Sequence, residues 1–195
     1  MIRVHHLNNS RSQRILWMLE ELKLKYEIIH YERDAKTLQG PASLRKVHPL
    51  GKSPAITDDS NGEQLLIVES GAIIEYLMQT YGKNSSLITP ETGSQKERDY
   101  RYWLHFSEGS LMPPLLLRFI FHRVKKAPVP FFVKPITKTI ANKVLTGFVN
   151  PNIQRSLDFI EASLEGKHWF LGDQLSGADI QMSYPLEASV ARGLI

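Results

Sequence analysis

The chain has 195 residues, of which 42% are hydrophobic and none is cysteine. This composition is normal for a globular protein and excludes a disulfide framework, a thiolate metal site and a cysteine nucleophile belonging to the protein. The formal net charge is +4. Neither an apolar leader nor an apolar run long enough to span a membrane is present, so we expect a cytoplasmic protein.

Strand and helix signals alternate from the amino terminus. Ile2 and Val4 alternate with polar neighbours as in a short strand, residues 15–22 carry apolar side chains at helical spacing, and residues 26–31 show a second strand pattern. A strand, a helix and a strand in this order form a βαβ unit. The two strands are therefore predicted to be parallel.

A hairpin and a helix follow this unit. Two short apolar runs, 55–57 and 65–68, flank the pair Asn61-Gly62, which is typical of a hairpin turn. A helical pattern then covers residues 70–81. The sequence thus predicts an α/β domain of residues 1–82 with the element order βαβ-ββα.

The rest of the chain is predicted to be helical. After a linker at 83–92, apolar residues recur at helical spacing, which predicts an all-α domain of residues 93–195. Ser176 and Asp179 fit a capping box, in which the serine hydroxyl accepts from the amide of Asp179 and the carboxylate accepts from the amide of Ser176. Pro185 should kink or end the helix that follows. The apolar end of the chain has no stop signal, which is compatible with a shortened sequence.

Basic residues are concentrated in this helical part. No acidic residue lies between Glu108 and Asp158, whereas eight lysines and arginines do. They are interleaved with apolar residues at helical spacing, as on a solvated helix face, so we expect no nucleic-acid partner and no stable membrane insertion. Binding of anionic membranes or nucleic acid through segment 118–155 remains an alternative. The eight residues are Arg118, Arg123, Lys125, Lys126, Lys134, Lys138, Lys143 and Arg155.

Polar residues join the first strand to the first helix. They run from Asn8 to Ser12, and the helix begins near Arg11. The amino end of a helix offers unpaired amides and a partial positive charge, which favour an anion such as a thiolate. Ser10 or Ser12 can donate a hydrogen bond to that anion, or serve only as a helix cap.

Two further segments have the chemistry of a ligand site. Segment 48–54 ends in Ser53-Pro54 directly before a strand, where a cis bond would turn the backbone of Ser53 toward an extended peptide. Glu69 and Ser70 stand where the hairpin ends and a helix begins, so Glu69 suits an ammonium group and Ser70 a carboxylate. Lys52 suits a second carboxylate, although a solvated lysine is the commoner case.

Together these segments resemble the glutathione transferase family. The matching pieces are 10–14, 48–54, 68–73 and 171–179, and segment 108–115 is similar to a bacterial and fungal subgroup related to yeast glutathione transferase. The resemblance implies a thioredoxin-like N-terminal domain that holds glutathione, a helical domain that supplies an electrophile pocket, a cis Pro54 and a homodimer. In serine-type members the hydroxyl stands four residues before an arginine, and Ser10 with Arg14 reproduces this spacing.

The resemblance also implies individual site residues. Ser10 is the expected catalytic residue, with Ser12 in reserve. Glutathione, as a co-substrate rather than a cofactor, is expected to contact Arg11, Lys52, Ser53, Pro54, Glu69 and Ser70. The small hydrophobic electrophile is expected to contact Leu111, Leu115 and Phe119, for which ordinary core packing is an equally good explanation.

The predicted function is glutathione S-transferase activity on small hydrophobic electrophiles or peroxides. A free thiol with a pKa of about 8.5 is mostly protonated at neutral pH, and lowering that pKa by about two units requires roughly 2.7 kcal/mol of selective thiolate stabilisation. A non-catalytic glutathione-binding module on the same fold is a further alternative. No metal site is expected, because adjacent His5 and His6 point to opposite faces of a strand.

Overall fold

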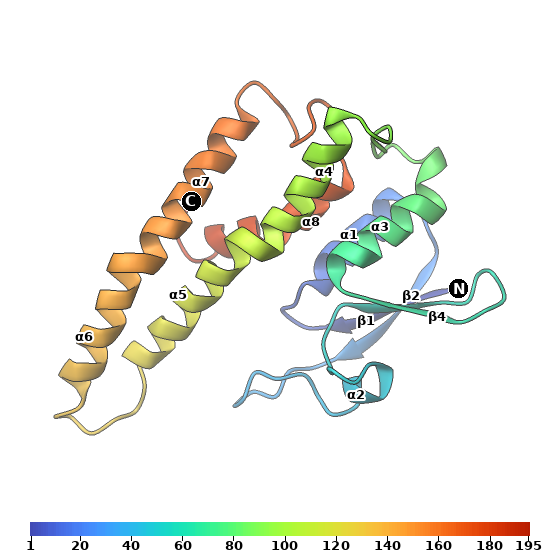
Figure 1. Cartoon of the computed structure of the whole chain (residues 1–195). Coiled ribbons are helices and arrows are strands. Elements are labelled where there is room, and N and C mark those ends of the chain that lie inside the picture. Colours follow the sequence, from blue (N-terminus) through green and yellow to red (C-terminus); the bar gives the residue numbers. More distant parts are fainter. The chain divides into compact units, whose positions relative to one another are not determined.

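The computed structural model describes the whole chain apart from the side chain of Asn84. By its internal contacts the chain forms two compact units (Figure 1). The first contains Met1–Leu104 and Trp169–Tyr184, and the second contains His105–His168 and Pro185–Ile195. Packing units need not coincide with domains along the chain, so the predicted domain and linker bounds stay predictions.

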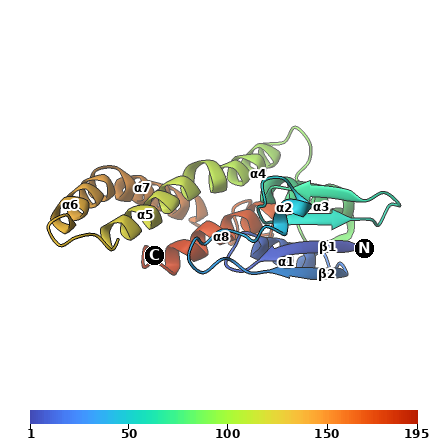
Figure 2. The same ribbon diagram turned by 90° about the horizontal axis from the view of Figure 1, so that it is seen from below.

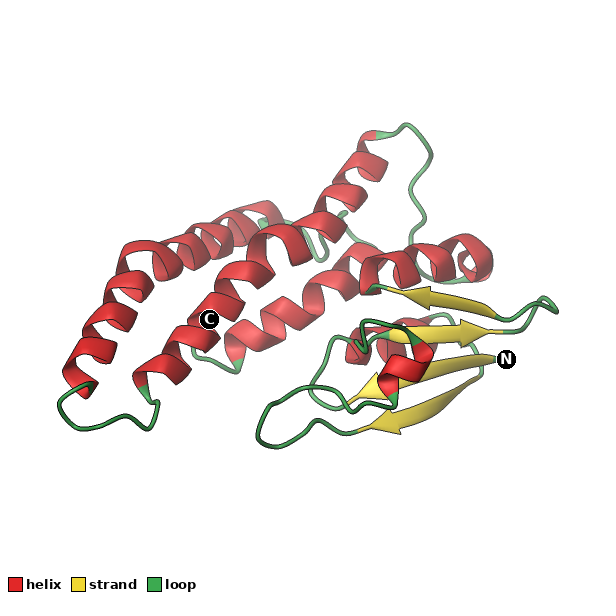
Figure 3. Cartoon of the chain, turned by 60° about the horizontal axis from the view of Figure 1, so that its bottom comes forward, coloured by secondary structure: helices red, strands yellow, loops and turns green.

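A four-stranded sheet with strand order β2-β1-β3-β4 forms the base of the first unit (Figure 3). β1 (Ile2–Leu7) is parallel to β2 (Tyr26–Tyr31) and antiparallel to β3 (Ala55–Asp58), and β3 pairs with β4 (Leu65–Val68) in an antiparallel hairpin. The predicted parallel pair and hairpin are confirmed. So is the α/β fold class of this part of the chain.

Two amphipathic helices pack against this sheet and against each other. They are α1 (Ser12–Glu21) and α3 (Ser70–Tyr81), and the predicted bounds of α3 are confirmed (Figure 2). The apolar residues on the inner face of each helix recur at helical spacing and are buried, as the periodicity predicts. The core includes Val4, Ile15, Met18, Leu19, Ile56, Ile73, Ile74 and Leu77.

A short helix in the loop between β2 and β3 was not predicted. It is α2 (Leu44–Val47), a single turn in which only Leu44 is buried. A segment of this length holds only one apolar anchor, so it shows no periodicity that a sequence pattern could reveal.

The last helix, α8 (Gly177–Val190), contributes its first half to the first unit. The prediction that Pro185 ends a helix is wrong, because α8 continues through it. Proline has no N–H to donate to the carbonyl four residues earlier, that of Gln181. This carbonyl accepts instead from Nη1 of the buried Arg14 at 2.6 Å.

The start of α8 is capped by Ser176 and Asp179. The predicted bond from the Ser176 amide to the carboxylate is present at 2.9 Å, but the serine hydroxyl accepts from the amide of Ala178 at 3.2 Å rather than from that of Asp179. The hydroxyl also donates to the carboxylate at 2.5 Å. An aspartate is shorter than the usual glutamate, so its carboxylate stays within reach of the hydroxyl.

In the described part of the chain, seven helical elements follow each other from residue 82 to residue 164. After η1 (Gly82–Asn84) and α4 (Gln95–Phe106) come η2 (Ser107–Leu111), α5 (Met112–Lys125), α6 (Lys134–Val144), η3 (Leu145–Val149) and α7 (Asn150–Leu164). Both η2 and η3 are π-helical and directly precede prolines at the first turn of the next helix. Prolines lack the N–H that the preceding turn needs, which accounts for the wider turn.

In the second unit, α5 and α6 lie antiparallel and side by side (Figure 1). Their inner faces bury Leu115 and Ala141, and the neighbouring turns bury Leu111, Leu145 and Val149. The prediction of a helical C-terminal part is confirmed. Within the part of the chain that the structure describes, no helix has the length and apolar character needed to cross a membrane.

Candidate functional site

The register of the sheet brings the predicted ligand segments to one edge. Ala55, the first residue of β3, pairs with both His5 of β1 and Val68 of β4. The loop after β1, the loop before β3 and the residues after β4 therefore begin at the same end of the sheet. Residues far apart in the sequence form one candidate site there.

Two serine hydroxyls lie at the amino end of α1. Ser10 is 4% exposed and Ser12 is fully buried, and their Oγ atoms are 2.8 Å apart. The cap position of α1 is Arg11, whose side chain makes no capping bond, while Ser10 Oγ accepts from the amide of Ser12 at 3.3 Å. Ser10 thus combines a capping contact with a hydroxyl at the positive end of a helix.

Ser53 links the loop before β3 to β1 and to Ser10. Its hydroxyl donates to the carbonyl of His5 at 2.8 Å and accepts from the amide of Leu7 at 3.3 Å. Its Oγ also lies 3.5 Å from that of Ser10. The Ser53–Pro54 peptide bond is cis, as the family resemblance implied.

A histidine extends the serine pair. His6 Nδ1 lies 2.9 Å from Ser12 Oγ, and the imidazole of His6 meets that of His30 on β2 edge to face at 5.7 Å. Burial, and secondarily His30, lowers the pKa of His6. From the sequence, His6 is a candidate only for metal binding, and this contact is not predicted. A histidine late in a strand and a serine opening the next helix are the signal for it.

The amino end of α3 carries the predicted zwitterion site. Glu69 is exposed and has φ 69° and ψ 123°, and it occupies the cap position. The cap of α3 is thus Glu69 and not Ser70. Ser70 is the first helical residue, is 3% exposed, and its hydroxyl accepts from Nε2 of Gln181 at 3.2 Å. The first amides of α3 have no acceptor within the helix and suit a carboxylate.

Two arginines of α1 share one aromatic ring. The guanidinium carbons of Arg11 and Arg14 lie 5.5 and 5.3 Å from the ring centre of Tyr184. Arg14 is buried, whereas Arg11 is partly exposed and Lys52 is exposed. Arg14, four residues after Ser10, therefore has a packing role, because its hydrogen bond to the Gln181 carbonyl connects α1 to α8.

The residues predicted to contact an electrophile belong to the second unit. Leu111 and Leu115 are fully buried there, as core side chains are. Phe119 is 37% exposed, with the guanidiniums of Arg123 and Arg192 at 5.8 and 5.6 Å from its ring centre. Their contact with an electrophile stays a prediction.

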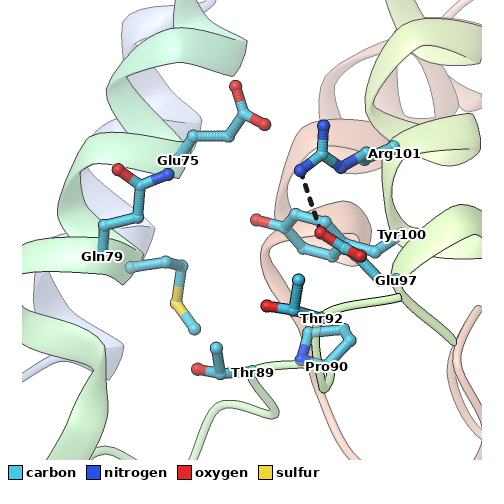
Figure 4. Close-up of a pocket in the computed structure, with 9 residues that line it drawn as sticks. Glu75, Gln79, Thr89, Pro90, Thr92, Glu97, Tyr100 and Arg101 are labelled. Carbon is cyan, nitrogen blue, oxygen red and sulfur yellow. Dashed lines mark hydrogen bonds and ion pairs between the residues drawn. The ribbon is translucent and has the colours of Figure 1, made fainter. Parts of the chain in front are cut away.

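A pocket of about 260 Å³ lies within the first unit, between α3, the segment before α4, and α4 itself (Figure 4). No sequence motif pointed to it. Tyr100 is 8% exposed, and its hydroxyl has no hydrogen-bond partner among the described residues. Burial, with help from the nearby Glu75 carboxylate, raises the pKa of this hydroxyl. Arg101 closes one wall by an ion pair of 2.9 Å with Glu97.

Comparison with known proteins gives one consistent result. Residues 1–79 match the family model "Glutathione S-transferase, N-terminal domain", and residues 126–191 match "Glutathione S-transferase, C-terminal domain". Glutathione S-transferase 1 of Saccharomyces cerevisiae is 36% identical over 195 residues, which are 98% of this chain and 82% of the yeast protein.

Two solved structures are similar over nearly the whole chain. A glutathione S-transferase of Actinobacillus pleuropneumoniae has a TM-score of 0.75 and 34% identity, covering 98% of this chain and 79% of the other. A glutathione transferase of Burkholderia graminis, solved with two glutathione molecules bound per subunit, has a TM-score of 0.77 and 27% identity, covering 98% and 73%.

Proposed function

The chain belongs to the glutathione S-transferase family, and we propose that it joins the sulfur of glutathione to small hydrophobic electrophiles. The match to both family domains and the 36% identity with the yeast protein support this activity. They favour it over the two alternatives, a non-catalytic glutathione-binding module and a binder of anionic membranes or nucleic acid.

One observation carries the proposed chemistry: the Ser10 hydroxyl lies at the amino end of α1, beside Ser53 and at the edge of the sheet where Glu69 follows β4. A sulfur placed there meets a hydroxyl donor and the positive end of a helix. Both interactions favour the thiolate over the thiol. Because Ser10 is buried, the hydrogen bond forms largely out of water, where it is stronger.

The same edge of the sheet suits the rest of the tripeptide. Glu69 pairs with the α-ammonium of the γ-glutamyl group, and Ser70 with the first amides of α3 holds its carboxylate. The backbone of Ser53, before Pro54, pairs with the peptide, while Arg11 and Lys52 supply positive charge for the second carboxylate. Glutathione is a co-substrate in this scheme, and no separate cofactor is required.

The thiolate then attacks the electrophile. The sulfur forms a bond to an electrophilic carbon while the leaving group departs with the electron pair. With a peroxide, the sulfur bonds to one oxygen as a sulfenic acid, the O–O bond breaks, and the other oxygen departs with the electron pair as an alkoxide. Of the residues predicted to contact this second substrate, Leu111 and Leu115 are fully buried and Phe119 is 37% exposed, so we assign the apolar contact to Phe119. We further propose that the enzyme acts as a homodimer.

The decisive variant is Ser10→Ala. It should raise the pKa of enzyme-bound glutathione by about two units and lower turnover about a hundredfold, with glutathione affinity nearly unchanged. The thiolate is measured by its ultraviolet absorbance against pH, and turnover by thioether formation. The fold is checked by urea unfolding.

Ser43→Ala is the matched control. Ser43 is exposed and its side chain makes no capping bond, so this variant should behave as the unchanged protein does. Normal turnover in Ser10→Ala would refute the assignment of the hydroxyl. Intact glutathione binding without thioether formation from any electrophile would instead favour the binding module.

A further inference from the structure

We propose that His6 accepts the thiol proton of glutathione through a relay of two hydroxyls, Ser10 and Ser12. The inference rests on the proposed function, since it requires the sulfur to bind at Ser10. His6 acts through the two serines and is therefore a positioning residue rather than one that touches the substrate. No sequence pattern indicates a proton-accepting role for His6.

Geometry supports a continuous path. Ser10 Oγ and Ser12 Oγ are 2.8 Å apart, and Ser12 Oγ and His6 Nδ1 are 2.9 Å apart, both within the range of good O–H···O and O–H···N hydrogen bonds. The competing acceptor for the Ser12 hydroxyl, the carbonyl of Leu7, is farther away at 3.4 Å. The Ser12 proton is thus directed toward the imidazole.

The remaining hydroxyl nearby is already committed. Ser53 donates its only hydroxyl proton to the carbonyl of His5 at 2.8 Å. Its Oγ lies 3.5 Å from Ser10 Oγ, farther than Ser12 Oγ at 2.8 Å, so it competes only weakly for the Ser10 proton and offers that proton no onward path. The path from Ser10 leads through Ser12.

The proton shift balances along this path. The thiol proton moves to Ser10 Oγ, the Ser10 proton moves to Ser12 Oγ, and the Ser12 proton moves to His6 Nδ1, so that the net change is a thiolate and an imidazolium. Both serines remain hydroxyls. Each hydroxyl now donates toward the sulfur, so Ser10 ends with its hydrogen bond aimed at the thiolate that it must stabilise.

The surroundings of His6 suit a transient acceptor. A neutral imidazole can accept at Nδ1 when its proton is on Nε2, and its lowered pKa keeps it neutral near pH 7. The titratable group that acts on it is His30 of β2, whereas α1 contributes only the Ser12 hydroxyl. His6 is partly exposed, so the proton can pass from Nε2 to water.

His6→Gln tests the relay. A glutamine keeps a hydrogen-bonding partner for Ser12 but cannot carry a proton from one nitrogen to another. On mixing with reduced glutathione, the protein should release the thiol proton at least about tenfold more slowly than the unchanged enzyme, and the pKa of the bound thiol should rise by about one unit. Proton release is followed with an indicator dye in weak buffer, and added imidazole should restore its rate.

Two further variants make the result specific. Ser12→Ala interrupts the same path and should give the same loss, with no additional loss when combined with His6→Gln. His30→Gln changes the exposed neighbouring imidazole but leaves the path intact, and it should release protons at the normal rate.

The outcomes separate this inference from the proposed function. If Ser10→Ala loses the thiolate while His6→Gln and Ser12→Ala release protons normally, the relay is refuted and the function stands. If Ser10→Ala keeps the thiolate, the assignment of the Ser10 hydroxyl fails and the relay fails with it. If imidazole does not restore His6→Gln, or if His30→Gln is equally slow, His6 has a structural role only and the relay is refuted.

Discussion

Asp58, at the end of β3, shows how one buried carboxylate can hold a turn and a helix together. It is 2% exposed and accepts from the amide and hydroxyl of Ser60 at 2.9 and 2.6 Å, and from the hydroxyls of Tyr76 and Tyr81 at 2.9 and 2.5 Å. Burial alone would raise the pKa of Asp58, but these hydrogen bonds outweigh it and lower the pKa to about 2. The hairpin turn is thereby fixed to α3.

This lowered pKa predicts a pH-dependent contribution to stability. The usual pKa is 3.8, so the stabilisation is fully present above that value and is lost as the pH falls through about 2. At pH 7, Asp58→Asn should lower the free energy of unfolding by about 2 kcal/mol, and the difference should narrow below pH 3.8. Urea unfolding at several pH values measures it.

The neighbouring Asp59→Asn is the control. Its carboxylate is 36% exposed and forms ion pairs with Arg3 and the terminal amine, which water weakens, so Asp59→Asn should lose much less stability than Asp58→Asn. An Asp58→Asn variant no less stable than this control would show that the hydrogen bonds to Asp58 contribute little.

Glu69 combines an unfavourable backbone with a predicted ligand contact. Its φ of 69° is one that residues with a side chain rarely adopt, and such strain typically costs of order 1–3 kcal/mol. Glu69→Gly should therefore stabilise the fold by about 1 kcal/mol while weakening glutathione binding about tenfold. Glu69→Gln should weaken binding similarly without the gain in stability. Calorimetry with glutathione and urea unfolding measure the two effects, and unchanged affinity in both variants would disprove the ammonium contact.

At the scale of elements, sequence patterns worked where a segment is long or its turn has a distinct signature. The periodicity of residues 70–81 and the Asn61-Gly62 turn predicted α3 and the hairpin because local interactions determine both. The four residues of α2 are too few to show periodicity. Pro185 does not end α8, because the carbonyl of Gln181 that it leaves without an amide donor accepts a hydrogen bond from Arg14, 167 positions away in the chain. No local pattern contains that partner.

The residues of the candidate site likewise divide into those that the sequence predicts and those whose contacts it does not predict. Ser10, Ser53 and Glu69 were found because each lies at a strand or helix end with a recognisable neighbour. The contacts of Ser12 with His6 and of Ser70 with Gln181 depend on how α1 and α8 pack in the first unit. A family resemblance identifies candidate site residues, whereas these contacts can be known only from the three-dimensional structure.

The start of α8 illustrates how tightly its helix packs. A Cβ atom added to Gly177 would lie 2.6 Å from both Ile74 Cγ2 and the Tyr100 hydroxyl oxygen. Gly177→Ala should therefore destabilise the protein by about 1–3 kcal/mol in urea. Gly147→Ala is the matched control, since nothing lies within 4 Å of its added Cβ and alanine favours helices. Equal stability of the two variants would mean that the side chains of α3 and α4 shift to accommodate the added methyl group at little cost in free energy.

At the scale of the whole molecule, the first unit is discontinuous in sequence. Residues 169–184 belong to it, and they bury Phe170 against Trp103 at a ring distance of 4.3 Å as well as forming the Arg14 and Ser70 contacts. His105–His168, together with Pro185–Ile195, form the second unit. The glutathione-binding part therefore depends on residues near the end of the chain.

This dependence predicts the effect of truncation. A chain that ends at His168 lacks the contacts of Gln181 with Arg14 and Ser70 and that of Tyr184 with Arg14, so it should lose cooperative unfolding and glutathione binding. A chain that ends at Ala191 keeps all of α8 and should retain both. Circular dichroism in urea and calorimetry compare them, and a stable, glutathione-binding chain ending at His168 would show that α8 is dispensable.

The hydrogen bond between Arg14 and α8 also affects the order in which contacts form during synthesis of the chain. A ribosome makes Arg14 long before it makes Gln181, 167 positions later, so the guanidinium can reach this carbonyl only after α8 has been synthesised. The amino-terminal helix thus gains its contact with α8 only after the segment up to Gln181 has emerged, which makes this contact a late step of folding during synthesis.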